Sequence, residues 1–452
     1  MAASISNRIA RFITETKFED LHSAVVKMSK RCLLDFLGVS LGSGKTDLIG
    51  NASDMLFDIA GKPEATVIDE KRKLPMLHAA LINGIKGHTL DMDDGNRYGN
   101  VHPGVVIFPA ALCLAEKQDV GGKEFIASVV TGYETMVYLA KVMNPHHLRR
   151  GFHTTANTGA FGAAAACSKI IGLGLEQVEN ALAIASLCGG GLLEVLSSGQ
   201  MMKPYQTARA AQAGLMAALL AKAGARGPVL ALEGENGFFR AYTDKKIGLE
   251  NFEGLGSDFE ILNTYFKRYS VCRHIHSALD AVENILKTFQ LNPENITSIE
   301  VETYSIAFNL TGRRTTETSE IAAKFSMPVS IAVMIAYGSL GQSAFSEQNI
   351  SAPLVQSLAD KVVVRIDPER DVRYPEQRGA KVTITSNEER YENEVNYPKG
   401  EPENPITDDE LGKKFNKFAR KLLPKNRVQE IEDNVFLLEN INIRHLMESL
   451  AG

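Results

Sequence analysis

Three stretches rich in glycine and alanine constrain the fold of this 452-residue chain more than any other feature of its sequence. Alanine has the highest helix propensity, and small side chains let two helix axes approach closely. The sequence therefore predicts a body of tightly packed helices that buries these stretches. They are residues 159–172, 181–191 and 208–225.

Apolar periodicity predicts a helical first half and a change of structure near residue 255. Ile9, Phe12 and Ile13 begin a series of apolar residues at helical spacing. Three later segments instead alternate apolar with polar residues and are rich in β-branched side chains, as strands are. These segments are residues 298–310, 361–366 and 380–384.

Helical patterns lie between the predicted strands, at residues 276–289 and 331–337, and helix returns from Asp408 onward. In that last part, one helical face is expected to carry Leu411, Phe415, Phe418 and Leu422. We therefore expect a mainly α protein with two domains. Residues 1–255 plus 405–452 form a large all-helical domain, and residues 256–404 form a smaller α+β domain.

Composition excludes several classes of protein. The chain has 49 basic and 54 acidic residues, a balance that argues against a nucleic-acid-binding face. Its apolar runs are too short to span a bilayer, and its start lacks the apolar region of a secretory signal. Its five cysteines are widely spaced without a CxxC pair, so neither a disulfide framework nor a zinc site is indicated. We expect a cytoplasmic protein with no nucleic-acid or membrane partner.

The first polar stretch with chemical potential runs from His88 to Asp94 and is followed by His102 in a His-Pro-Gly turn. His88 and Asp91 are three residues apart, so they share a face if the helix continues. Three carboxylates within four residues repel one another, so some must be paired or have raised pKa values. The alternative is a solvated acidic turn, although the turn at His102 suits the mouth of a cleft.

Three further stretches place polar side chains among apolar segments. His153 precedes a small-residue helix and could also be a capping or core histidine. Lys203, in the stretch 199–205, would need a partner or an anionic ligand if it were buried. Residues 267–276 contain three cations and two histidines, and a helix pattern follows them directly.

Together these stretches supply acids, neutral bases and fixed cations, without metal-ligand spacing or a nucleophile triad. Lysine and arginine can hold substrate carboxylates and stabilise the charge that develops as a proton leaves. A histidine or aspartate with a pKa near neutral can take and return that proton. The pattern favours proton abstraction next to a carboxylate, which needs no cofactor and no metal.

At these same residues the chain resembles the MmgE/PrpD family along nearly its whole length. The resemblance implies a large helical domain with a smaller α+β domain, a homodimer, and an active site without metal or cofactor. Activities in this family include 2-methylcitrate dehydratase, cis-aconitate decarboxylase and iminodisuccinate epimerase. The matching pieces are HTLDMDDGNRYGNVHPG (88–104), GFHTT (151–155), KPYQTARAAQAG (203–214), LEGENGFF (232–239), CRHIH (272–276) and AKFSMP (323–328).

The resemblance also implies a set of site residues. Our hypothesis is that Lys203, Lys267 and Arg273 grip carboxylates, that His102 and His153 move protons, and that Asp91 orients a histidine. Arg97 adds a carboxylate contact. The active-site set implied by the family motifs is Asp91, His102, His153, Lys203 and Lys267, with Arg97, Arg273, His276 and Cys272 as substrate-binding residues.

Three positions depart from the family pattern as the resemblance presents it. Gly95 stands where lyase members have threonine, Cys272 where the decarboxylase has histidine, and Val329 where many relatives have tyrosine. We therefore expect a hydro-lyase acting on a small di- or tricarboxylate, of the 2-methylcitrate or citrate type, before a cis-aconitate decarboxylase. The alternatives are an epimerase of an imino- or hydroxy-dicarboxylate and, more remotely, a non-catalytic carboxylate-binding protein.

Overall fold

The computed structural model describes residues 4–59, 61–196, 202–315 and 319–452, and these form two compact units. Unit 1 comprises Met1–Glu194, Met202–Thr264 and Thr407–Gly452, and unit 2 comprises Val195–Met201 and Tyr265–Ile406. The predicted class is confirmed, because unit 1 is built of helices and unit 2 combines helices with a small mixed sheet. Residues 199–201 of the stretch around Lys203 lie outside the described part of the chain.

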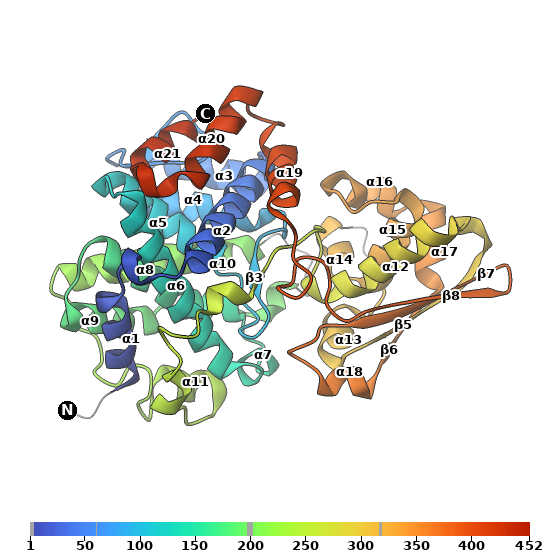
Figure 1. Ribbon diagram of the computed structural model, residues 1–452, viewed down its shortest axis with the longest axis horizontal. Coiled ribbons are helices and arrows are strands. Elements are labelled where there is room, and N and C mark those ends of the chain that lie inside the picture. Colours follow the sequence, from blue (N-terminus) through green and yellow to red (C-terminus); the bar gives the residue numbers. More distant parts are fainter. Residues whose placement is uncertain (1–3, 60, 197–201, 316–318) are drawn as a thin grey trace. The chain divides into compact units, whose positions relative to one another are not determined.

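Unit 1 joins the first and last segments of the chain in one helical body. The helices α19, α20 and α21 of the C-terminal segment pack against α2 and α5 of the N-terminal half (Figure 1). Short two-residue strands lie between some of the helices: β1 (Ala65–Thr66), β2 (Lys73–Leu74) and β3 (Gly95–Asn96). The helices are α1 (Ile5–Glu15), α2 (Ser23–Gly42), α3 (Asp47–Asp58), α4 (Met76–Thr89), α5 (Gly104–Gln118), α6 (Gly122–Met143), α7 (His146–Arg149), α8 (Thr154–Ile170), α9 (Leu175–Ser186), α10 (Lys203–Lys222), α11 (Phe238–Thr243), α19 (Asp408–Ala419), α20 (Lys425–Phe436) and α21 (Ile443–Ser449).

The core of unit 1 lies around α8, whose residues are almost all buried. Small residues bring the neighbouring helices within backbone distance of it. A Cβ atom added to Gly214 of α10 would lie 2.4 Å from the carbonyl oxygen of Ala160, and one added to Gly162 would lie 2.8 Å from Cβ of Met136 on α6. The first small-residue stretch is thus buried almost throughout, whereas the other two bury one face and expose residues such as Leu187 and Leu220 on the other.

The end of α4 corrects one sequence prediction. The helix stops at Thr89, and Asp91 has a φ of 51°, in the left-handed region that non-glycine residues seldom occupy. His88 and Asp91 therefore do not share a helical face. The chain turns at Asp91 into a loop that carries the acidic residues toward the start of α5.

Unit 2 contains a four-stranded sheet with the strand order β6-β5-β7-β8. Strand β5 (Ile296–Thr303) is parallel to β6 (Val362–Ile366) and antiparallel to β7 (Ala380–Ser386), which pairs antiparallel with β8 (Glu389–Val395). The helix α12 packs against β7 and β8. The helices of unit 2 are α12 (His276–Phe289), α13 (Ser305–Thr311), α14 (Glu320–Lys324), α15 (Met327–Tyr337), α16 (Glu347–Ile350), α17 (Pro353–Asp360) and α18 (Pro368–Val372).

The predicted strands are correct in place, but one is too long. β5 ends at Thr303, and Ser305–Thr311 forms the helix α13, in which Ala307 and Thr311, four residues apart, are buried. Strand β8 was not predicted, because its alternating residues are mostly charged and none of them is buried. Leu422 was also misplaced, because α19 ends at Ala419 and Leu422 is 43% exposed.

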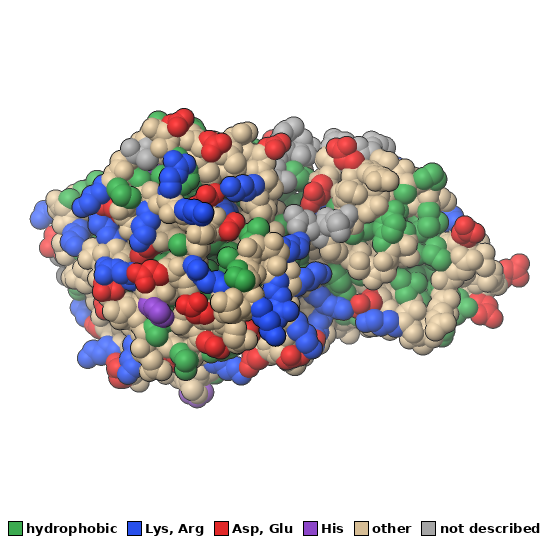
Figure 2. Space-filling view, turned by 90° about the horizontal axis from the view of Figure 1, so that it is seen from above, with side chains coloured by type: hydrophobic (Ala, Val, Ile, Leu, Met, Phe, Trp, Pro, Cys, Tyr) green, Lys and Arg blue, Asp and Glu red, His purple; other side chains and the backbone are tan. Residues whose placement is uncertain are grey.

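The described surface carries both signs of charge. Over much of the face shown in Figure 2, basic and acidic side chains lie next to one another. None of the helices in the described residues combines the length and the apolar character that a bilayer span requires.

Candidate active site

The loop between α4 and α5 gives each of its three aspartates a different partner within unit 1. Lys203 Nζ donates to Asp91 Oδ1 at 2.7 Å. His88 and His102 both approach Asp93 Oδ2, at 2.9 and 3.0 Å. Asp94 accepts from the backbone N–H of Gly104 at 3.0 Å and from the hydroxyl of Tyr133 at 2.6 Å. The carboxylates are therefore separated by their partners.

The electrostatics agree with the expectation that three neighbouring aspartates cannot all be ordinary charged groups. Burial raises the pKa of Asp94 to about 7. Burial would raise the pKa of Asp93 as well, but its attraction to the adjacent rings of His88 and His102 and the hydrogen bonds that they donate hold this pKa well below its usual range. Asp93 is therefore a buried anion at neutral pH, whereas Asp94 is close to its midpoint of titration.

A lysine from the C-terminal segment fixes the backbone of this loop. Lys414 Nζ, on α19, donates to the carbonyl of Met92 and to Asp35 Oδ1, both at 2.6 Å. The lysine side chain is 12% exposed and that of Asp35 is fully buried. The helix α19 thus fixes the peptide between Asp91, which binds Lys203, and Asp93, which lies next to the two histidines.

His102 is held by its backbone and by its ring. Its backbone N–H donates to Thr155 Oγ1 at 3.1 Å, at the start of α8. Its Nδ1 lies 2.7 Å from the carbonyl oxygen of Asp94. A carbonyl oxygen only accepts, so this nitrogen carries a hydrogen, and in the neutral ring the lone pair is on Nε2.

His153 precedes α8 and is a second neutral base in the same neighbourhood. Its Nδ1 lies 3.0 Å from Gln206 Oε1, and the amide of Gln206 is oriented because its Nε2 donates to the carbonyl of Leu192. His153 Nδ1 is therefore the donor. Burial lowers the pKa of His153 well below its ordinary value, and the charges of Lys203, His88 and His102 lower it further.

The cation predicted at Lys203 is paired, as a poorly exposed lysine requires. Lys203 is the first residue of α10, and Pro204 follows it in the first turn, where its missing N–H costs nothing. The lysine side chain is 16% exposed and Asp91 is 10% exposed. Arg97 lies near its neighbour Tyr98, with Nη2 3.1 Å from the tyrosine hydroxyl.

Unit 2 holds the remaining predicted residues. They lie in the basic stretch 267–276, most of which is buried. The side chain of Arg273 is bound by Glu401 Oε1 at 2.8 and 3.1 Å, by the carbonyl of Lys399 and by His276 Nδ1 at 3.0 Å. Arginine can only donate, so His276 Nδ1 accepts and its Nε2 faces the carbonyl of Val271 at 3.4 Å. Arg273 and His276 are thus engaged by protein groups.

Lys267 and Cys272 are also buried in unit 2. Lys267 lies two residues after strand β4 (Thr264–Tyr265) and is 1% exposed. The backbone N–H of Cys272 donates to the carbonyl of Lys324 at 3.0 Å, which joins the CRHIH and AKFSMP motifs. Val329, one of the three positions that depart from the family pattern, lies inside α15 and is buried.

Among the described residues, His88, Asp93 and His102 have the composition of a metal site, with ligand atoms within 4.8 Å of one another. A metal would need a lone pair on the ring nitrogens that face Asp93. The Asp94 carbonyl requires a hydrogen on Nδ1 of His102, so the donor set does not fit a cation in this arrangement. His88 and Asp93 are instead members of a hydrogen-bonded group that the sequence analysis did not assign to the site.

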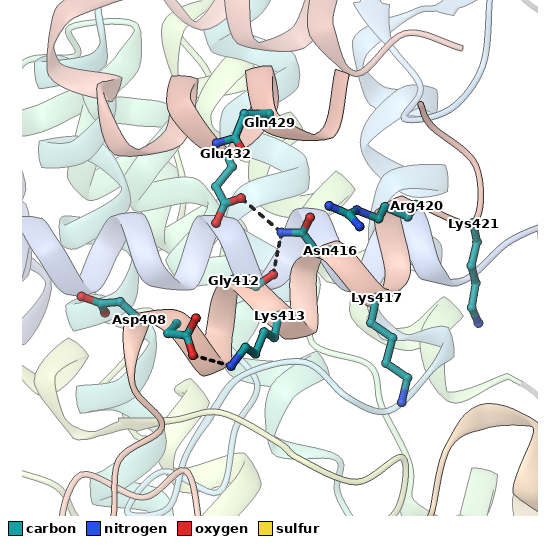
Figure 3. Close-up of a pocket in the computed structure, with 10 residues that line it drawn as sticks. Asp408, Gly412, Lys413, Asn416, Lys417, Arg420, Lys421, Gln429 and Glu432 are labelled. Carbon is teal, nitrogen blue, oxygen red and sulfur yellow. Dashed lines mark hydrogen bonds and ion pairs between the residues drawn. The ribbon is translucent and has the colours of Figure 1, made fainter. Parts of the chain in front are cut away.

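A charged groove of about 600 Å³ lies elsewhere on unit 1, between α19 and α20 (Figure 3). Asn416 donates there to the carbonyl of Gly412 at 2.9 Å and to Glu432 at 3.2 Å. None of the predicted site residues lines this groove. Its size therefore does not make it the candidate site.

The raised pKa of Asp94 predicts a pH-dependent contribution to stability. Between pH 3.8, the ordinary pKa of an aspartate, and about pH 7, Asp94 holds a proton in the folded state that it has lost in the unfolded state. The free energy of unfolding therefore falls as pH rises through this range. In Asp94→Asn, the amide can accept from Gly104 and donate to the Tyr133 oxygen without titrating.

We expect urea unfolding to show that Asp94→Asn gains about 1–3 kcal/mol relative to wild type between pH 5 and pH 8, because one pKa unit corresponds to about 1.4 kcal/mol. Asp119→Asn, at an exposed helix end, is the control and should follow the wild-type curve. Parallel pH curves for wild type and Asp94→Asn would contradict the assignment.

Comparisons with known proteins agree with the order of the motifs. The MmgE/PrpD N-terminal domain matches residues 7–249, and the MmgE/PrpD C-terminal domain matches residues 269–438. A cis-aconitate decarboxylase-like protein of Aspergillus oryzae is 28% identical, over 99% of this chain and 98% of that protein. Cis-aconitate decarboxylases of Aspergillus terreus and Homo sapiens are 26% and 27% identical, over 99% and 98% of this chain and 96% and 93% of those proteins.

Proposed function

Because the chain belongs to the MmgE/PrpD family, we propose that it is a cofactor-independent lyase that removes a proton next to a carboxylate of a small di- or tricarboxylate. We assign the reaction to the hydro-lyase type. The observation that carries the proposal is the group of His102, His153 and the Lys203–Asp91 pair around one loop of unit 1. A base with a defined tautomer and a cation fixed to the same loop are what support the proposal.

The proposed reaction begins at His102. Its Nε2 takes the proton from the carbon next to the carboxylate, while the Lys203 ammonium binds that carboxylate and stabilises the charge that develops on it. The carbon–oxygen bond then breaks, a carbon–carbon double bond forms, and the His102 imidazolium returns its proton to the departing hydroxyl as water. His153 stays neutral and contributes a hydrogen-bonding nitrogen. Asp91 holds Lys203 in place.

The roles of the other predicted residues remain proposals. We propose that Lys267 contacts a second carboxylate of the substrate, and that Arg97 and Cys272 contribute to substrate binding. Arg273 and His276 bind one another and Glu401 within unit 2, so we propose that they act by shaping the segment between Lys267 and α12.

Decarboxylation is the second candidate, because the relatives described above are named cis-aconitate decarboxylases or are like them. The same base and cation would serve it, with carbon dioxide as the leaving group and a proton delivered to carbon. Cys272, at the position where the resemblance expects histidine, weighs against it. An epimerase would move the proton without a leaving group.

The experiment that tests the proposal is proton NMR of the purified protein with citrate, 2-methylcitrate, cis-aconitate, and hydroxy- and imino-dicarboxylates. New vinylic signals from a hydroxylated substrate, absent in His153→Ala and Lys203→Ala, would support the hydro-lyase. Release of carbon dioxide from cis-aconitate would replace it with the decarboxylase. Loss of a Cα proton signal without an alkene would replace it with the epimerase.

We also propose that the protein is a homodimer that uses the exposed face of α10. Tyr205, Met216 and Leu220 are about 40% exposed and are spaced by three turns and by one turn, so they form an apolar stripe. Such a stripe is typical of an interface between subunits. Light scattering coupled to gel filtration should give twice the chain mass for wild type. It should give the mass of one chain for the double variant Met216→Glu/Leu220→Glu. A monomeric wild type would contradict the proposal.

A further inference from the structure

The two histidines on Asp93 form an arrangement that the proposed reaction does not yet use in full. One carboxylate oxygen, Asp93 Oδ2, lies 2.9 Å from His88 Nδ1 and 3.0 Å from His102 Nδ1. The centroids of the two rings are 5.1 Å apart. Asp93 and His88 are fully buried, and the side chain of His102 is 14% exposed. All three residues belong to unit 1.

The positions of the protons follow from the acceptors. The Asp94 carbonyl, 2.7 Å from His102 Nδ1, requires a hydrogen on that nitrogen. Asp93 is ionised and can only accept, so His88 Nδ1 also donates to it. Both neutral rings therefore carry hydrogen on Nδ1 and the lone pair on Nε2. Ring tautomers are set in this way by the hydrogen bond that the other nitrogen makes.

We propose that Asp93 is a positioning residue that supports the His102 tautomer set by the Asp94 carbonyl and keeps an anion beside the imidazolium that forms when His102 takes the substrate proton. In this proposal His88 holds Asp93 in place without titrating. This inference rests on the proposed function for the role of His102. The two histidines are given different roles because their rings lie in different environments. His102 has the more exposed ring, whereas Nε2 of His88 is buried and has no hydrogen-bond partner among the described residues.

The buried charge of Asp93 has a direct consequence for the reaction. When His102 accepts a proton on Nε2, the imidazolium forms beside an anion that is already in place, so little reorganisation is needed. His88 cannot compete for that charge, because burial lowers its pKa to about 4. A neutral His88 donating to Asp93 keeps the carboxylate fixed while the charge on His102 changes.

The direct test is nitrogen-15 NMR of the histidine rings in the full-length protein at neutral pH, without substrate. We expect both rings to give signals of the tautomer with hydrogen on Nδ1, one of which disappears in His102→Gln and the other in His88→Gln. In Asp93→Asn, the tautomer of His102 should persist because the Asp94 carbonyl remains, but the anion beside the imidazolium is lost. kcat should fall by about 10²–10⁴-fold with a smaller change in KM, as when a carboxylate that orients a histidine is removed elsewhere.

Asp94→Asn is the matched control, because it removes the neighbouring buried carboxyl while the carbonyl that binds His102 remains. It should keep both tautomer signals. Hydrogen on Nε2 of His102 in wild type, or an unchanged kcat in Asp93→Asn, would overturn the inference even if the protein proved to be a lyase. Stoichiometric binding of Zn²⁺ that is lost in His88→Gln and in Asp93→Asn would also overturn it. If the tautomers are as stated but no substrate reacts, only the proposed function fails.

Discussion

Replacing Lys203 with methionine is expected to lower kcat/KM by about 10²–10³-fold, the range seen when a group that stabilises transition-state charge is removed. Methionine keeps most of the length of the side chain but removes the ammonium that binds Asp91 Oδ1 at 2.7 Å. The poorly exposed Asp91 would lose that cation and would repel an anionic substrate. The loss should therefore appear in both kcat and KM, measured by steady-state kinetics on the substrate that the NMR panel identifies.

The control for this variant is Lys222→Met, at the exposed far end of the same helix. It should leave both constants unchanged. The double variant Lys203→Met/Asp91→Asn should lose less than the sum of the two single variants, because each residue acts through the other. Additive effects, or a Lys203→Met enzyme close to wild type, would contradict the role given to the pair.

Replacing Gly214 with alanine is expected to destabilise the protein by about 3 kcal/mol, the upper part of the range for overpacked cores. The new Cβ would lie 2.4 Å from the carbonyl oxygen of Ala160 and 2.5 Å from Cβ of Ala163, so α10 would have to move away from α8. Alanine is the better helix former by about 1 kcal/mol, so helix propensity alone predicts the opposite sign. Urea unfolding measures which effect is larger.

Gly50→Ala provides the matched comparison. Gly50 lies within α3, and a Cβ there would meet nothing within 4 Å. This variant should be more stable than wild type by about 0.5–1 kcal/mol. If both glycine variants shifted stability in the same direction, close packing of α8 and α10 would not be what maintains the core.

Much of the fold could be predicted from the sequence because its signals are local. The small residues of α8 and α10 encode close packing directly, and the apolar repeat of α12 gives that helix its bounds. The strand β8 was not predicted because its side chains are largely charged and none is buried, so no buried face alternates with a polar one. The end of α4 escaped because a left-handed Asp91 leaves no pattern in a single sequence.

The candidate site shows the same limit. Asp91 and Lys203 lie 112 positions apart in the sequence, and no local pattern in either stretch predicts that they are in contact. Sequence reasoning gave Asp91 the role of orienting a histidine, and it did not single out Asp93, which lies next to both His88 and His102. The crowding of aspartates indicated that such partners exist. The anchor from Lys414 could not be predicted, because the tail carries many lysines and only packing selects one.

The most direct test of the account is hydration of the alkene product by the protein in D2O, because this reverse reaction adds deuterium to the carbon from which the forward reaction removes a proton. Mass spectrometry should find one deuterium on the carbon next to a carboxylate with wild type. We expect the rate to fall by about 10²-fold or more in His102→Gln, because general-base catalysis contributes 10²–10⁴-fold. Hydration without deuterium at that carbon, or undiminished incorporation by His102→Gln, would contradict proton transfer at this site.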